Sequence, residues 1–372
     1  MKKNILKNEG VQSLLASLIC IVLGLLIGLI VLLFINPAGA FDAILAIIKN
    51  FFTYSRANLQ LKNFGNTLVQ TAPLLMCSLS VLFCYKVGLF NIGAAGQYVV
   101  GACVSIYAAL AFGLPWWVAL LLAILVGAIY GAIVGLLKAY GNVNEVISGI
   151  MLNWIGLYTT NMILSAVKEE TSPYTLHLKD HAPSSILPTL GLDKLFANNA
   201  YVSLAIPLAI LVAIALKVIL DQTRFGYELK ATGYNKNAAK YAGMAEKRNI
   251  IVTLAIGGAL AACGGALFYL TDFEQWSVTA STVPGMGFNG IAAAFLGGLN
   301  PIGTIFSSYF IQHITRGGAY VDKTLYSAQI SDLISAIIIY LCGFVGFMKL
   351  AMKKRIAAKE EKQQKTTKGA DA

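Results

Sequence analysis

The chain has 372 residues, of which 57% are hydrophobic and only 12% are charged, whereas roughly a quarter of the residues are charged in an ordinary soluble protein. So few charges cannot cover so much apolar side chain in water, which excludes a soluble domain, a disordered chain and a secreted disulfide scaffold. Because a spanning helix needs roughly 20 apolar residues, the length allows about ten such segments. We therefore predict an all-α polytopic membrane protein.

The charge balance is basic, with 28 Lys and Arg against 17 Asp and Glu and a formal net charge of +11. These charges lie between apolar segments, which favours basic cytoplasmic loops over a nucleic-acid-binding surface. The 6 cysteines all lie within apolar segments and form no C-x-x-C pair. They are interpreted as small hydrophobic residues rather than disulfides or metal ligands.

The first apolar segment spans residues 14–35, contains no charge and follows Lys2, Lys3 and Lys7. A signal peptide is the alternative, since Ala38-Gly39-Ala40 resembles a cleavage site, but the apolar region of a signal peptide is only about 7–15 residues long. We predict an uncleaved helix that follows a cytoplasmic tail, residues 1–13. Residues 41–62 are amphipathic with mixed charges, which predicts an interfacial segment on the outer side.

Further apolar segments follow along the rest of the chain. We predict spans at residues 66–85, 92–112, 116–137, 143–167, 200–220, 250–271, 288–299, 302–315 and 331–350. Pro301 divides two short segments, which predicts a broken hairpin in the membrane. The transmembrane domain thus covers residues 14–350, with an outer loop at 168–199, a basic inner loop at 221–249 and a basic cytoplasmic tail at 351–372. With both termini inside, most Lys and Arg are cytoplasmic, as the positive-inside bias requires.

Two short motifs resemble each other. One is Gly88-Leu89-Phe90-Asn91-Ile92-Gly93-Ala94-Ala95, and the other is Gly287-Phe288-Asn289-Gly290-Ile291-Ala292-Ala293-Ala294. The number of predicted crossings between them is odd, so the two motifs enter the membrane from opposite faces. Inverted repeats with helix breaks near the midplane are a recurring transporter design. A chance match of common residues is the alternative.

No pattern in the chain indicates catalysis. It contains no Gly-Lys dipeptide and therefore no phosphate-binding P-loop. His177 and His181 have the spacing of a helical metal pair, but Pro173 and Pro183 favour a solvated loop. No acidic residue lies in the middle of a predicted span, which argues against ion-coupled transport. We expect no catalytic residue, metal or cofactor in this chain.

Neutral polar residues within the predicted spans favour a small, uncharged solute. Helix breaks expose backbone groups that are tolerated only where they line a cavity, and aromatic rings there can stack on a base or sugar face. The tentative solute path therefore consists of Phe90, Asn91, Gln97, Asn153, Phe288 and Asn289. Ordinary hydrogen bonding between helices is the alternative for each of them.

The inner loop is predicted to form a helix, a break at Gly233 and a short second helix that ends at Gly243. Asn235 is a suitable N-cap for the second helix. Ala238, Ala239 and Ala242 are predicted to form a small, flat face that fits a groove on another protein. A plain amphipathic connector is the alternative.

This loop resembles the coupling helix of ABC importer permeases, in the branch that moves branched-chain amino acids, simple sugars and nucleosides. The matching pattern is Ala231-Thr232-Gly233-x-Asn235-x-x-Ala238-Ala239-x-x-Ala242-Gly243. Residues 90–97 and 144–153 are similar to the nucleoside-type subgroup. Ala95 departs from the pattern, because relatives often carry Glu at that position.

The resemblance implies a transport subunit in the bacterial cell membrane rather than an enzyme. Two separate ATP-binding subunits, which carry ATP and Mg²⁺, would dock on the coupling residues, namely Glu228, Gly233, Asn235, Ala238, Ala239 and Gly243. A second permease, expected to be a paralogue, would complete the path, and an extracytoplasmic binding lipoprotein would deliver a nucleoside or simple sugar. An autonomous secondary transporter or channel for a small neutral solute is the alternative.

Overall fold

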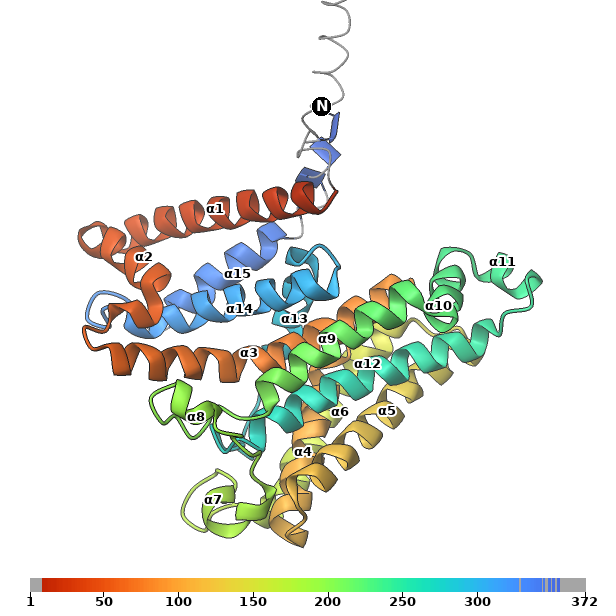
Figure 1. The fold of residues 1–372 in the computed structure, drawn as a ribbon, viewed down its shortest axis with the longest axis horizontal. Coiled ribbons are helices and arrows are strands. Elements are labelled where there is room, and N and C mark those ends of the chain that lie inside the picture. The colour runs from red at the N-terminus through yellow and green to blue at the C-terminus, as the bar shows by residue number, and fades with distance from the viewer. Residues whose placement is uncertain are drawn as a thin grey trace, which may run out of the picture.

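The computed structural model describes residues 9–327, 329–342, 344, 347–348, 350–351 and 353–354. Most of the two predicted tails, residues 1–13 and 351–372, lies outside these residues. The described chain is helical, and two isolated β-bridges are its only extended pairing. The helices are α1 (Glu9–Ile35), α2 (Ala40–Lys49), α3 (Ala57–Lys86), α4 (Ala94–Phe112), α5 (Trp116–Gly141), α6 (Glu145–Leu164), α7 (Leu178–His181), α8 (Leu192–Leu195), α9 (Ala205–Gln222), α10 (Arg224–Tyr234), α11 (Lys236–Tyr241), α12 (Glu246–Tyr269), α13 (Met286–Leu296), α14 (Pro301–Gly317) and α15 (Ile330–Cys342) (Figure 1).

The predicted spans correspond to helices. Within the described residues, 7 helices are long and apolar enough to cross a membrane, namely α1, α3, α4, α5, α6, α9 and α12. The shorter α13, α14 and α15 occupy the last three predicted segments. Of the predicted interfacial segment, residues 57–62 form the first turns of α3. The amphipathic part is α2, which buries Ala43, Ile44 and Ile47.

The two large hydrophilic loops lie at opposite ends of α3, a helix about 45 Å long at 1.5 Å per residue. The Asn199 amide nitrogen donates to Lys62 O at 2.9 Å, which places loop 168–199 at the start of α3. Gly233 of loop 221–249 packs against Val87, directly after the end of α3. Figure 1 shows the same separation of α7 and α8 from α10 and α11. The positive-inside bias assigns the α10–α11 end to the cytoplasm.

The chain also returns to the end of the molecule at which it starts. Gly28 of α1 lies against Ile334 of α15, and the Tyr326 hydroxyl donates to Asn36 O at 2.5 Å beyond the outer end of α1. From that point α15 runs back toward the start of α1 (Figure 1). This direction agrees with the prediction of an even number of crossings.

Helices α13 and α14 form the predicted broken hairpin, and α3 shows how deep each reaches. Gly290 of α13 packs on Cys77, and the ring of Phe295 lies 5.0 Å from that of Tyr85 near the inner end of α3. The turn that follows includes Gly298 with φ 67° and Leu299 with φ 54°. The Asn300 side chain then caps α14 by accepting from Ile302 N at 3.0 Å, and α14 returns to the outer end.

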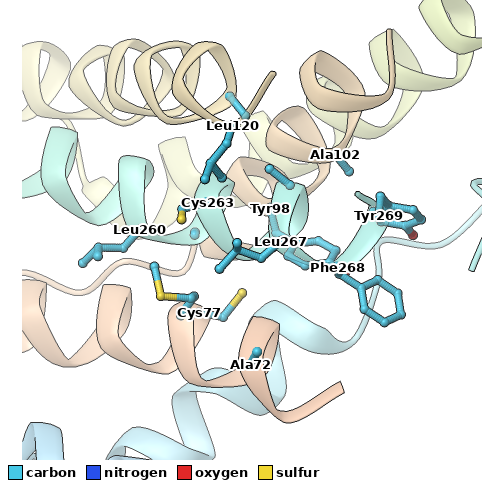
Figure 2. Packing of buried hydrophobic residues seen from close by; sticks show 14 of the residues in the cluster. Ala72, Cys77, Tyr98, Ala102, Leu120, Leu260, Cys263, Leu267, Phe268 and Tyr269 are labelled. Carbon is cyan, nitrogen blue, oxygen red and sulfur yellow. The ribbon is translucent and has the colours of Figure 1, made fainter. Parts of the chain in front are cut away.

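Helix α12 occupies the centre of the bundle and packs on α3, α4 and α5. Three glycines of α5, spaced four residues apart, make the contact with α12, because a Cβ atom at Gly131 would lie 2.1 Å from Leu254 O. Gly127 and Gly135 approach α12 in the same way. Figure 2 shows the apolar side chains around this contact, which include Ala72, Cys77, Tyr98, Ala102, Leu120, Leu260, Cys263, Leu267, Phe268 and Tyr269.

Candidate solute path and coupling surface

The first helix break, residues 87–93, is held by buried side-chain amides. Asn91 and Gln97 are 2% and 1% exposed. Asn91 Nδ2 donates to Gln97 Oε1 at 2.8 Å and to Ser80 Oγ at 2.9 Å, and Gln97 Nε2 donates back to Asn91 Oδ1 at 3.3 Å. The Ser80 hydroxyl in turn donates to Gly257 O at 2.6 Å. The two amides thus tie the break to α3, α4 and α12.

Asn153 of α6 completes this amide network. Its Oδ1 accepts from Gly96 N at 2.7 Å, in the first turn of α4, and its Nδ2 donates to Ile92 O at 3.1 Å. Ile92 O belongs to the break, and Gly96 N is one of the first N–H groups of α4, which have no partner within the helical ladder. The structure therefore brings together three of the predicted path residues. Their observed contacts are hydrogen bonds between helices, and their role in the solute path stays a prediction.

The second break is the non-helical segment that ends where α13 begins, and it lies directly against the first. A Cβ atom at Gly287 would lie 2.4 Å from Ala95 Cα, so the backbones at the starts of α13 and α4 touch. The two similar sequence motifs therefore meet in the middle of the bundle. Ala95 is itself buried at this contact, 1% exposed.

Phe288 and Asn289 were predicted to lie at a helix break but lie in the first turn of α13, directly after the non-helical segment, and their contacts differ from those of Phe90 and Asn91. Phe288 is 40% exposed and Asn289 is half-buried. No side-chain hydrogen bond joins Asn289 to the part of the chain that the structure describes, and no ring contact joins Phe288 to the half-buried Phe90 there. Asn289 is thus the predicted path amide that remains available to a solute.

This difference between the two amides predicts different effects of their removal. We expect Asn91→Ala to lower the melting temperature of the protein in detergent, because buried hydrogen-bond partners left unsatisfied cost about 1–3 kcal/mol. Asn289→Ala should melt like the wild-type protein and reduce solute uptake. Thermal melting and uptake are measured for both variants. Early melting of Asn289→Ala, with uptake in proportion to folded protein, would assign Asn289 to packing as well.

The outer loops form one connected layer. Asp272 Oδ1 accepts from Leu178 N at 3.1 Å and thereby holds the start of α7. The amide of Gln275 donates to Glu169 Oε1 at 2.8 Å, and this bond, with help from Ser172, holds the pKa of the Glu169 carboxyl below its usual value. His177 lies within this layer, 3.3 Å from Asp272. His177 and His181 gather no further ligand, and the described residues contain no cluster that could hold a metal ion.

Asn161 of α6 makes two contacts that the sequence analysis did not predict. Its Nδ2 donates to Ala280 O at 2.8 Å, and its Oδ1 accepts from Trp276 Nε1 at 2.9 Å. Asn161 thereby fixes the segment that precedes α13 against the outer half of α6. An amide in an apolar span was the only signal in the sequence, because both partners are distant along the chain.

The short helix of the inner loop, α11, begins and ends as predicted. Asn235 Oδ1 accepts from Ala238 N at 3.0 Å, which confirms the N-cap of α11. Gly243 has φ 80°, which confirms the left-handed stop that favours glycine. Two aromatic side chains of this loop project into solvent, Tyr234 and Tyr241, which are each 92% exposed.

The predicted flat face of α11 needs a correction. Ala239 is 3% exposed and packs toward the chain itself, whereas Ala238 and Ala242 are exposed. Helix α11 has few residues, so one side must rest on its neighbours while the other faces outward. The available surface, here called the coupling surface, consists of Tyr234, Ala238, Tyr241 and Ala242.

Helix α10 connects the coupling surface to the first helix break. A Cβ atom at Gly233 would lie 2.3 Å from Val87 O, so the backbones of the two segments touch. One turn earlier, Glu228 O accepts the Thr232 hydroxyl at 2.8 Å, and Asn249 Nδ2 donates to the same hydroxyl at 2.9 Å. Helix α10 is therefore in direct contact with the segment that leads into Asn91.

One protein family and several individual transport proteins match the chain. Residues 63–343 match the family described as "Branched-chain amino acid transport system / permease component". The chain is 32% identical to the guanosine ABC transporter permease protein NupP of Bacillus subtilis over 351 residues, which cover 93% of this chain and 97% of the relative. It is 30% identical to the nucleoside ABC transporter permease protein NupB of Lactococcus lactis subsp. cremoris over 373 residues, 96% of this chain and 99% of the relative.

A third relative has a different named solute. The chain is 30% identical to a glucose ABC transporter permease of Haloferax volcanii over 292 residues, which cover 74% of this chain and 75% of the relative. No solved structure matches the chain.

Proposed function

The chain belongs to the family of branched-chain amino acid transport system permease components, and on this basis we propose that it forms part of the membrane path of an ABC importer for nucleosides. The family makes it a multi-pass permease subunit of the plasma membrane, not an autonomous transporter. The identity of the solute is what we add to the family assignment, and it rests on a single observation. The two relatives matched over nearly their whole length are named for guanosine and nucleosides, whereas the glucose permease is matched over 75% of its length.

The polar groups of the path support an uncharged solute. The amides of Asn91, Gln97 and Asn153 surround the first break without a formal charge, and Asn289 retains an unused amide at the second. A nucleoside offers hydroxyl and heterocyclic donors and acceptors that suit such groups. Simple sugars share the hydroxyls but lack a planar heterocycle, and they are the second candidate.

The energy and the delivery of the solute come from other subunits in this proposal. Two ATP-binding subunits carry ATP and Mg²⁺ and dock on the coupling surface. A second permease, a paralogue of this chain, closes the other side of the path. A binding lipoprotein docks on the outer layer that joins loop 168–199 to residues 272–280.

The test uses the complete transporter in cells without other nucleoside uptake. We expect energy-dependent uptake of radiolabelled guanosine that excess unlabelled nucleosides abolish and excess glucose does not. Competition by glucose, with no guanosine uptake, would identify a sugar importer. The purified complex should also contain the ATP-binding subunits, and their absence from an active preparation would contradict the proposed coupling.

A further inference from the structure

One stripe of α6 carries polar aromatic side chains that the described chain leaves partly exposed. Trp154, Tyr158 and Asn161 are spaced by four and three residues and therefore share one helix face. Trp154 and Tyr158 are 42% and 58% exposed. Their rings are nearly parallel, at 24°, with centroids 6.1 Å apart. Neither Trp154 Nε1 nor the Tyr158 hydroxyl has a hydrogen-bond partner among the described residues.

This aromatic pair lies near the middle of the membrane. Helix α6 has 20 residues, and it begins at Glu145, which pairs with Lys138 at 2.8 Å near the inner end of α5. Trp154 is close to the midpoint of that helix. Exposed Trp and Tyr are usually found at the two membrane interfaces, where their polar atoms reach water. At mid-depth, lipid tails offer these atoms no partner, so a lipid-facing position does not explain the pair.

A non-helical segment passes beside the same stripe. Asn161 holds Ala280 O at its outer end, and Gly287 rests on Ala95 at its inner end, one residue from the contact of Gly96 with Asn153. Asn161 and Asn153 are separated by about 12 Å along α6 at 1.5 Å per residue. Residues 281–285 thus descend by that depth without a regular helix.

The descending segment needs water or a solute beside it. Ser281, Thr282 and Gly285 are exposed, and the backbone N–H groups of residues 281–283 find no acceptor within the described chain. Irregular backbone at membrane depth occurs only where it is buried in protein or lines an aqueous cavity. Because Asn161 of the α6 stripe holds the outer end of this segment, an aqueous space beside the segment would also adjoin the stripe.

We propose that Trp154, supported by Tyr158, forms the stacking surface for the planar heterocycle of the solute in this space. The proposal deepens the proposed function and rests on its nucleoside assignment. An aromatic face binds any nucleobase with little preference, because every base has a π face. The hydroxyls and free N–H groups of residues 281–283 then supply the hydrogen bonds that lipid cannot.

Substitution of Trp154 tests the aromatic contact. We expect Trp154→Leu to reduce guanosine uptake by at least about tenfold, the order of a lost base-stacking contact, while Trp154→Phe keeps most of it. The matched control is Trp117→Leu, at another exposed Trp on the outer end of α5, which should transport normally. Unchanged uptake by Trp154→Leu would overturn the proposal, and so would loss of the second permease from the purified complex.

Accessibility provides a measurement that does not depend on which solute is carried. In the complete transporter, Trp154→Cys should react with a small membrane-impermeant thiol reagent, and the transported solute should slow that reaction. Ile129→Cys, at an exposed aliphatic position near the middle of α5, should stay unreactive, and the native Cys20, Cys77, Cys84, Cys103 and Cys263 are buried. Equal protection of both sites would show that lipid or the partner permease covers Trp154. If glucose rather than guanosine gives protection, the water-lined surface stands while the nucleoside assignment fails.

Discussion

Ala238→Arg is expected to abolish solute uptake while the membrane domain stays folded. Ala238 lies on the exposed side of α11, between Tyr234 and Tyr241, which are each 92% exposed. An Arg side chain there adds bulk and a charge where an ATP-binding subunit must fit closely, without disturbing any internal contact. The measurements are uptake in cells and the amount of ATP-binding subunit that purifies with the variant. Retention of those subunits together with normal uptake would show that α11 is not the docking element.

Two Ala→Arg controls separate docking from folding. Ala239 is 3% exposed, so Ala239→Arg forces a buried charge and should lower the melting temperature of the membrane domain, whereas Ala238→Arg should not. Ala245, exposed on the same loop beyond the Gly243 stop, provides the third variant. Ala245→Arg should keep both uptake and the ATP-binding subunits. If all three variants behave alike, the added charge on the loop, and not a lost docking contact, explains the loss of uptake.

The second large effect is expected at the contact between α5 and α12. A Cβ atom at Gly131 would lie 2.1 Å from Leu254 O and 3.1 Å from Gly258 Cα. Both are backbone atoms of α12, which cannot rotate aside as a side chain would. Gly131→Ala must therefore separate two helices at the centre of the bundle, at a cost of about 1–3 kcal/mol or more. We expect the variant to give little monodisperse protein and a lower melting temperature.

The matched control is the same substitution at the end of the same helix. At Gly141 an added Cβ atom would meet only the flexible side chain of Val143, at 3.2 Å. Gly141→Ala should be neutral or stabilising by up to about 1 kcal/mol, because Ala favours helix over Gly. Size-exclusion profiles and melting curves compare the two variants. A stable Gly131→Ala protein would mean that α5 and α12 can move apart without loss of the fold.

The sequence alone determined the fold class, the positions of the spanning segments and the local fold of the inner loop. These features are local. A run of apolar residues requires a spanning helix wherever it packs, and the Asn300-Pro301 break specifies its own turn and cap. The same is true of α11, since Asn235 caps the helix and Gly243 ends it through contacts within the loop.

The tertiary structure decided which side of each segment is used. Ala238 and Ala239 are adjacent and chemically identical, and only the packing of α11 buries one and exposes the other. Asn91, Asn153 and Asn289 are alike in the sequence as amides in apolar segments. The side chains of Asn91 and Asn153 form hydrogen bonds, whereas that of Asn289 forms none with the described residues.

The contact between the two similar motifs, through Gly287 and Ala95, depends on how α13 enters the bundle. Each of these features is a contact between residues far apart along the chain, and local hydropathy and residue spacing carry no information about such contacts.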